Sequence, residues 1–414
     1  MNATVLNSLM DVAGAPAHPL VFLVLGVVTF ALHIAAVSLM LGTLGLSAWG
    51  AFSRSPYAGR LSHTLMMTAK VSVAFAVVLG VAPLLFVQVI YDSYWYVSNV
   101  LSAWWLMIFV VILIAAYLGL YRAYGLNHTY LEDGTPVPVH GEVRGGMWLV
   151  ASLVLLLGCG AIMHVLANQA LFPERWMSWY APGGVVNPDG RSLHYALLPR
   201  LIFFLSLSLP VTAGWLFALR RYLINGGETD TGYLGYIESM AHRFALAGAV
   251  LVAVSGAAWM MMLPESMVWF RQSVWVGIGL IPLIFFFVMS PVQKKRRLCI
   301  PCGYLAFVMS LVMVIILAAL REVMRYGTLL SAYGWNALDY KVNMDWSTTI
   351  IFFTTFVVVG GLNITYLTLL AFKSGHEKGV YTPGPALNRL GQACVVSLVA
   401  WVVAYFAIGL SVVS

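Results

Sequence analysis

The sequence has little charge and few cysteines. Only 9% of its 414 residues are charged, whereas 61% are hydrophobic, and the apolar residues come in long runs rather than in amphipathic stripes. A soluble domain does not need this much apolar surface, so the composition indicates a membrane protein. The four cysteines include one C-x-x-C pair, Cys299 and Cys302, with no second pair and no following histidine for covalent haem attachment. We expect this pair to be reduced and inert.

Several motifs are also missing. The sequence has no G-x-G-x-x-G on a strand, no P-loop, no H-E-x-x-H and no acidic ladder typical of a proton-coupled carrier. The first 53 residues contain no Lys or Arg, so there is no basic region of the kind that opens a signal peptide. We therefore expect the chain to start on the outer side of a membrane.

Ten apolar runs are long enough to cross a bilayer of about 30 Å. Continuous runs of about 20 residues favour helices over a closed barrel. The predicted fold is therefore an all-α polytopic bundle, a single membrane domain over residues 1–414. The runs are approximately 20–48, 65–90, 101–123, 147–170, 196–222, 243–263, 273–290, 302–322, 348–372 and 391–413.

The basic residues predict the orientation of the bundle. Alternating sides along the chain place 15 of the 22 Lys and Arg residues on one face, which we assign to the cytoplasm. Both termini then lie on the outer, periplasmic side. The net charge of +7 indicates topology rather than nucleic-acid binding, and we expect a bacterial cytoplasmic membrane protein.

Histidines in the apolar runs are candidate ligands. His33 and His164 lie too deep to reach the surface, so each needs a metal, a haem iron or a hydrogen bond to another helix. His18 enters the first run about 22 Å above His33 along a helix axis, so one iron cannot bind both. His194 precedes the fifth run. Imidazoles in an apolar bundle without thiolate clusters suit b-type haem, two or more if both His18 and His33 are ligands; haem d has no support in the sequence.

Charged residues near the membrane boundary form a second candidate group. Arg321, Glu322 and Arg325 end the eighth run, and Arg200 lies in the fifth. The arginines are candidate partners for haem propionates. Glu322 is a candidate weak axial ligand or proton acceptor. The alternative is a simple interfacial Arg–Glu pair.

These segments, in this order, resemble subunit I of the cytochrome bd quinol oxidases over most of the chain. In the resemblance His18 takes the position of a haem-ligating histidine, Glu322 that of an acidic haem-site residue and Arg325 that of a signature arginine, which implies catalytic roles for Glu322 and Arg325. The matching stretches are HPLVFLVLGVVTFALHI, KVSVAFAVVLGVAP, FVQVIYDSYWYVS, MHVLANQALFPERW, VTAGWLFALRRY, HRFALAGAVLVAVSG and EVMRYG.

The sequence also departs from that family. Phe203 or Phe204 stands where the family has the histidine ligand of its low-spin haem, and SVWVGIGL replaces the opposing Arg and Met. The third run lacks the family's glutamates, and the long quinol-binding loop is reduced to MMMLPESMVWFRQ. His33 and His164 have no counterpart there. The resemblance thus implies a divergent branch.

The sequence predicts a haem-b-binding subunit of a bd-like respiratory oxidoreductase that passes electrons to an acceptor such as dioxygen. Expected partners are a chain like the family's second subunit and a periplasmic cytochrome c or redox subunit as electron donor. If every iron has two imidazole ligands, the protein only relays electrons. A further alternative is a transporter or structural subunit whose buried His and Arg form interhelical hydrogen bonds.

Overall fold

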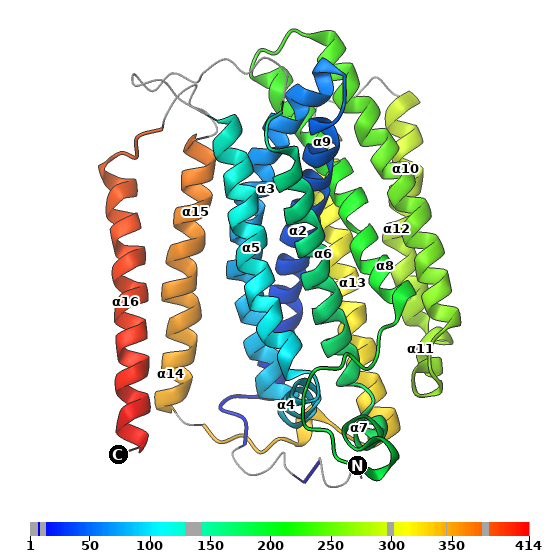
Figure 1. The fold of residues 1–414 in the computed structure, drawn as a ribbon, viewed down its shortest axis with the longest axis vertical. Helices are drawn as coiled ribbons and strands as arrows, with labels where there is room; N and C mark the ends of the chain where they lie inside the picture. The colour runs from blue at the N-terminus through cyan, green and yellow to red at the C-terminus, as the bar shows by residue number, and fades with distance from the viewer. Residues whose placement is uncertain are drawn as a thin grey trace. The chain divides into compact units, whose positions relative to one another are not determined.

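The computed structural model describes residues 7–8, 14–128, 143–295, 302–344, 346–374 and 381–413. Cys299 lies outside these ranges, so the expectation for the C-x-x-C pair is not addressed. Figure 1 labels the helices of the chain. They are α2 (Pro19–Ala51), α3 (Pro56–Ile90), α4 (Asp92–Val100), α5 (Ala103–Asn127), α6 (Gly146–Gln169), α7 (Pro173–Tyr180), α8 (Leu198–Ser206), α9 (Ser208–Asn225), α10 (Thr231–Met261), α11 (Val268–Arg271), α12 (Val274–Lys295), α13 (Cys302–Tyr333), α14 (Trp346–Thr354), α15 (Gly361–Ser374) and α16 (Pro385–Val413).

The predicted all-α polytopic fold is confirmed. Among the described residues, nine helical segments are long and apolar enough to span a membrane, and a tenth span is formed if the bent pair Glu265–Arg271 and Val274–Ile284 counts as one. The chain is thus an integral membrane protein. The side of the membrane on which the termini lie stays a prediction.

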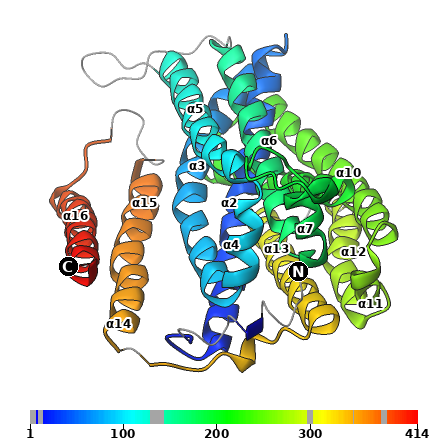
Figure 2. The same ribbon diagram turned by 60° about the horizontal axis from the view of Figure 1, so that its bottom comes forward.

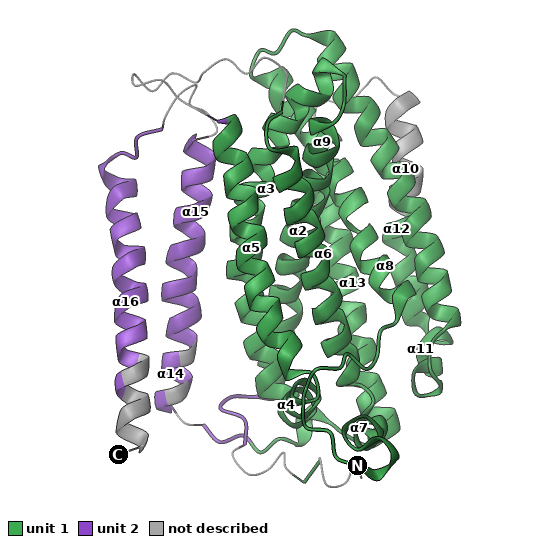
Figure 3. Cartoon of the chain, viewed as in Figure 1, with its two compact units in different colours: residues 1–13, 19–127, 141–341 green, residues 14–18, 128–140, 342–414 purple. Residues whose placement is uncertain are grey.

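The chain divides into two compact units (Figure 3). Unit 1 contains α2 to α13, and unit 2 contains residues 14–18, 128–140 and 342–414. The single domain over residues 1–414 stays a prediction. In unit 2, the π-helical turn Thr355–Gly360 joins α14 to α15, and Trp401 of α16 donates its indole N–H to Thr355 Oγ1 at 2.6 Å.

Unit 1 is organised around the antiparallel pair of α2 and α3. Small residues let these helices approach closely, as in many membrane helix pairs. A Cβ on Gly50 would lie 2.8 Å from the Ala58 carbonyl oxygen, and one on Gly80 would lie 2.8 Å from the ring of His33. The short helices α4 and α7 lie at the same end of unit 1 in Figure 2, which we call the α4 end.

Several predicted boundaries differ from the helix bounds, for example the starts of α3 at Pro56 and of α10 at Thr231, and the end of the eighth run bears on the site. The eighth run was expected to end at residue 322, but α13 continues to Tyr333, about three turns further. Arg321, Glu322 and Arg325 therefore lie inside a helix rather than at its end. The helix continues because Met324, Thr328 and Leu329 are buried at helical spacing.

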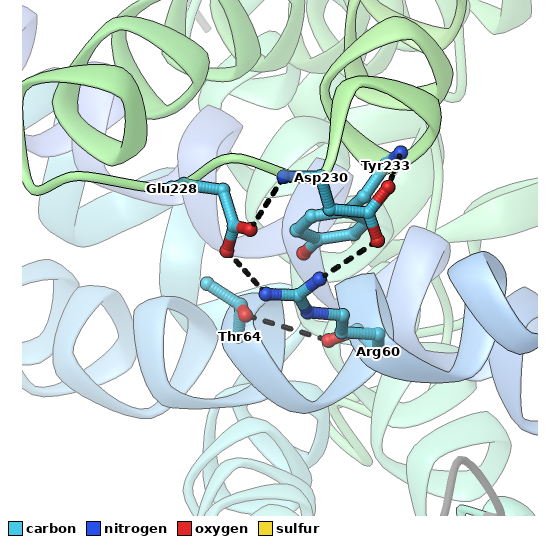
Figure 4. Close-up of polar contacts among 5 residues, drawn as sticks. All are labelled: Arg60, Thr64, Glu228, Asp230 and Tyr233. Atoms are coloured by element: carbon cyan, nitrogen blue, oxygen red, sulfur yellow. Dashed lines mark hydrogen bonds and ion pairs between the residues drawn. The ribbon is translucent and has the colours of Figure 1, made fainter.

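At the opposite end of α3, an ion-pair cluster ties this helix to the start of α10 (Figure 4). Arg60 pairs with Glu228 and, at 3.4 Å, with Asp230, and its guanidinium carbon lies 4.0 Å from the centre of the Tyr233 ring. Asp230 also caps α10 by accepting the Tyr233 N–H at 3.0 Å. We call Arg60, Glu228, Asp230 and Tyr233 the surface clamp.

Candidate functional site

Unit 1 contains an apolar cavity of about 450 Å³ lined by residues of α2, α3, α4, α5, α6, α8 and α13. This volume falls within the range of ligand-binding pockets. Most of its wall is aliphatic and aromatic. The ionisable side chains on the wall, besides the tyrosine Tyr91 and the thiol Cys159, are His33, His164, Arg200, Arg321, Glu322 and Arg325.

Six of the eight residues singled out in the sequence thus meet at one cavity. They come from α2, α6, α8 and α13, which are far apart in the chain. The other two, His18 and His194, are not among the lining residues.

His33 is held by the backbone of α3. Its Nδ1 lies 2.9 Å from the Ala76 carbonyl oxygen, which accepts a hydrogen bond only, so Nδ1 carries the proton. In a neutral imidazole the other nitrogen, Nε2, then has a lone pair. Histidines that bind metals commonly donate their second ring N–H to a carbonyl in this way. The residue therefore has the protonation and the support of a ligand.

His164 is held differently. Its Nε2 accepts from the Leu197 backbone N–H at 3.3 Å and lies 3.0 Å from the Asn168 side-chain nitrogen. The Asn168 oxygen in turn accepts from Arg200. Neither partner of His164 Nε2 lies on another helix, because Asn168 belongs to the same helix α6 and Leu197 to the segment just before α8. His164 Nε2 is nevertheless already engaged in hydrogen bonds. Its role as an iron ligand stays untested.

The acidic residue of the cavity is bound on both oxygens. Tyr91 donates its hydroxyl to Glu322 Oε1 at 2.6 Å, and Arg325 Nη2 lies 2.5 Å from Glu322 Oε2. Arg321 is further from the same oxygen, at 3.9 Å. The Arg–Glu pair expected as the simple alternative is present, yet it uses only one of the three arginines closely.

The remaining arginines rest on aromatic rings. The guanidinium carbon of Arg321 lies 4.1 Å from the centre of the Phe30 ring, and that of Arg200 lies 5.6 Å from the rings of Phe204 and Trp259. Cation–π contacts of this kind offset only a part of the cost of burying a charge. We call Arg200, Arg321, Glu322 and Arg325 the cavity cluster.

The cavity cluster carries an excess of two positive charges, because three guanidinium groups face one carboxylate. The side chains of Arg321, Glu322 and Arg325 are only 12–16% exposed, and Arg200 is 7% exposed. Buried charges are stable when they are paired. The arrangement is therefore suited to a ligand with two negative charges and an apolar body.

His194 lies in the non-helical segment that precedes α8. Its ring stacks on Trp179 with centroids 5.2 Å apart, and its backbone N–H donates to Gln169 Oε1 at 3.0 Å. Burial lowers the pKa of His194. This stacked position is away from the cavity wall. His18 is exposed and belongs to unit 2, so its predicted role as ligand stays a prediction.

The segment around His194 is fastened to the ends of α5 and α6. The indole of Trp105 donates to the Arg191 carbonyl at 2.6 Å, and the Ser102 hydroxyl donates to the Ser192 carbonyl at 2.6 Å. Together with the bond from Leu197 to His164, these contacts hold the segment against the α4 end.

Three residues that contact the cavity side chains were missed in the sequence. Tyr91 binds Glu322, Asn168 binds Arg200, and Gly80 faces the His33 ring. The spacing of Asn168 four residues after His164 placed both on one helix face. For Tyr91 and Gly80 no local signal existed, because their partners lie far away in the chain.

No protein-family model and no curated protein matches the sequence. Among solved structures, the bd oxidase from Geobacillus thermodenitrificans is similar, with a TM-score of 0.57 and 13% sequence identity. The match covers 91% of this chain and 99% of that chain. At this identity the likeness shows the fold alone: the chain has the fold of bd oxidase.

Proposed function

We propose that the chain is a haem-b-binding subunit of a bd-like respiratory oxidoreductase and that the cavity of unit 1 holds the haem. One observation carries the proposal. A single apolar cavity brings together an imidazole with a lone pair and a cavity cluster with two uncompensated positive charges. Ionisable side chains in the interior of a membrane bundle are costly and mark a functional site by default.

The residues present fit a b-type haem. An apolar wall suits the ring, two excess positive charges suit two propionates, and a neutral imidazole suits the iron. Bound haem supplies one-electron redox chemistry at its iron. In this chain His33 would hold the iron through Nε2, and Arg200, Arg321 and Arg325 would hold the propionates.

The remaining residues of the cavity have supporting roles. Asn168 positions Arg200, and Arg325 pairs with Glu322 on the apolar wall. Glu322 would hold or release a proton at Oε1, where the Tyr91 hydroxyl reaches it. His164, engaged through Nε2, leaves His33 as the cavity imidazole that offers a nitrogen. Bound haem would supply the redox chemistry needed to reduce an acceptor such as dioxygen or to relay electrons.

His18, in unit 2, would provide a second site, as the resemblance implies. Partners are proposed on the same basis: a chain like the second subunit of bd oxidases and, because the quinol loop is short, a periplasmic cytochrome c or redox subunit as donor. The location would be the bacterial cytoplasmic membrane.

A reduced-minus-oxidised visible spectrum of the purified protein, with a pyridine haemochrome assay, tests the proposal. We expect b-type haem at one or more equivalents per chain, and a spectral change on adding carbon monoxide. A stable, colourless preparation would refute it. Loss of bound haem in H33A but not in H63A, a histidine of α3 outside the cavity wall, would assign the iron to His33.

A further inference from the structure

Gly80 lies where the imidazole of His33 meets α3. A Cβ built on Gly80 would lie 2.8 Å from His33 Cε1 and 3.0 Å from Nδ1. Real side chains do not approach so closely, so the ring occupies the space that a side chain at position 80 would need. The hydrogen of glycine is what allows the imidazole to rest on the backbone of α3.

The same contact explains the hydrogen bond of His33. The Ala76 carbonyl lies one turn before Gly80 in α3, and an oxygen of a helical carbonyl has a second lone pair beyond its bond along the helix. His33 Nδ1 reaches that oxygen at 2.9 Å. The approach is close because no side chain at position 80 separates the two helices.

We propose that Gly80 and the Ala76 carbonyl form a positioning slot that fixes the plane and the tautomer of His33. The effect of the slot on haem rests on the proposed function. The slot itself depends only on the packing of α2 against α3. Gly80 touches no ligand in this account. It acts through His33, and the expected consequence is a defined orientation of the Nε2 lone pair.

A second glycine of the cavity provides a matched control. Gly26 of α2 also lines the cavity, but a Cβ there would lie 3.6 Å from the Cβ of Phe86, an ordinary contact. G26A and G80A thus add the same methyl group to the same helix pair. Only G80A should displace the imidazole.

The first readout does not depend on haem. Solid-state ¹⁵N NMR of histidine-labelled protein, with His33 assigned by its loss in H33Q, reports which ring nitrogen carries the proton. We expect Nδ1–H in the wild type and in G26A, and loss of that signal in G80A. An unchanged Nδ1–H signal in a folded G80A protein would overturn the slot.

The second readout is the bound haem. Changes around a metal-binding histidine typically weaken metal binding by about 10–100-fold, so G80A should lower haem retention by at least about tenfold or shift the electron paramagnetic resonance of the retained haem. G45A should do neither, because Gly45 of α2 lies outside the cavity wall and a Cβ there would lie 4.0 Å from Leu153 Cδ2. A G80A protein with wild-type haem content and an unchanged spectrum would refute the positioning role. If the wild-type protein contained no haem, the proposed function would be refuted. The positioning slot would still be tested, because the NMR readout does not depend on haem.

Discussion

An arginine cluster lies near each end of α3, and the two clusters have opposite charge balance. In the surface clamp, one guanidinium faces two carboxylates, and Arg60 is 44% exposed. In the cavity cluster near Tyr91, three guanidinium groups face one carboxylate and are largely buried. The comparison separates two uses of charge. The clamp lies near solvent, which stabilises its excess negative charge, whereas the excess positive charge of the cavity cluster is buried and is neutralised, in our proposal, by an anionic ligand.

The largest effect is expected from removing the closest partner of Glu322. In R325Q the carboxylate loses its 2.5 Å ion pair and remains buried. Breaking a buried pair on one side costs about 3–5 kcal/mol. The free energy of unfolding in detergent, measured for R325Q and for the double variant R325Q/E322Q, checks this. We expect the double variant to recover much of the stability that R325Q loses, because it no longer buries an unpaired carboxylate. A double variant as unstable as R325Q would contradict this reading of the cavity cluster.

Replacing Arg321 tests the excess charge directly. R321M removes a buried guanidinium that rests on Phe30 and is 3.9 Å from Glu322. Burying an ion costs several kcal/mol in desolvation, and the attraction of Arg321 to Glu322 at 3.9 Å offsets only a part of that cost. We expect R321M to raise the thermal stability of haem-free protein and to weaken haem retention. A loss of stability in the haem-free protein would contradict a charge excess.

Replacing the two histidines of the cavity wall should have different effects on haem retention. H164Q keeps an amide oxygen that can accept from Leu197 and Asn168, so we expect a loss of about 0.5–1.5 kcal/mol in stability and retained haem. H33Q should lose haem. Haemochrome assays on both variants check this, and haem loss in H164Q with retention in H33Q would reverse the assignment.

The smallest effects belong to the surface clamp. Exposed ion pairs contribute about 0.2–1 kcal/mol, so R60Q should lower the free energy of unfolding by no more than about 1 kcal/mol for each of its two pairs. The matched change at the other end of α3 is R325Q. If R60Q and R325Q lowered the free energy of unfolding equally, the surface clamp and the cavity cluster would not differ as we describe.

The clamp should also depend on pH. The backbone N–H of Asp230, 3.0 Å from Glu228 Oε1, and then the Arg60 guanidinium lower the pKa of Glu228. A carboxyl with a lowered pKa stabilises the fold above its unfolded value of about 4.3 and loses that contribution as pH falls through the folded value. The difference in stability between the wild type and E228Q should therefore shrink in acid. If this difference in stability grew in acid, it would contradict a lowered pKa of Glu228.

The sequence predicted the helices better than their contacts. Long apolar runs determined the number of spans, because burial in lipid needs little else. The end of α13 was missed because Arg321, Glu322 and Arg325 interrupt the apolar run although the helix continues to Tyr333. The division into two units was not anticipated.

For the candidate site, residue types were predictable and partners were not. The cost of burying charge singled out His33, His164, Arg200 and Glu322, and all four line the cavity. Their distinct states depend on contacts across the bundle. The Ala76 carbonyl frees Nε2 of His33, whereas Leu197 and Asn168 occupy Nε2 of His164. No spacing along the chain reveals such a difference.

The most direct test of the central claim is an electron cryomicroscopy map of the purified protein in lipid. We predict density for one flat macrocycle inside the cavity of unit 1, with His33 Nε2 bound at its centre and its acidic groups against the cavity cluster. A map with lipid, quinone or side chains filling that cavity, and no macrocycle beside His33, would contradict the account.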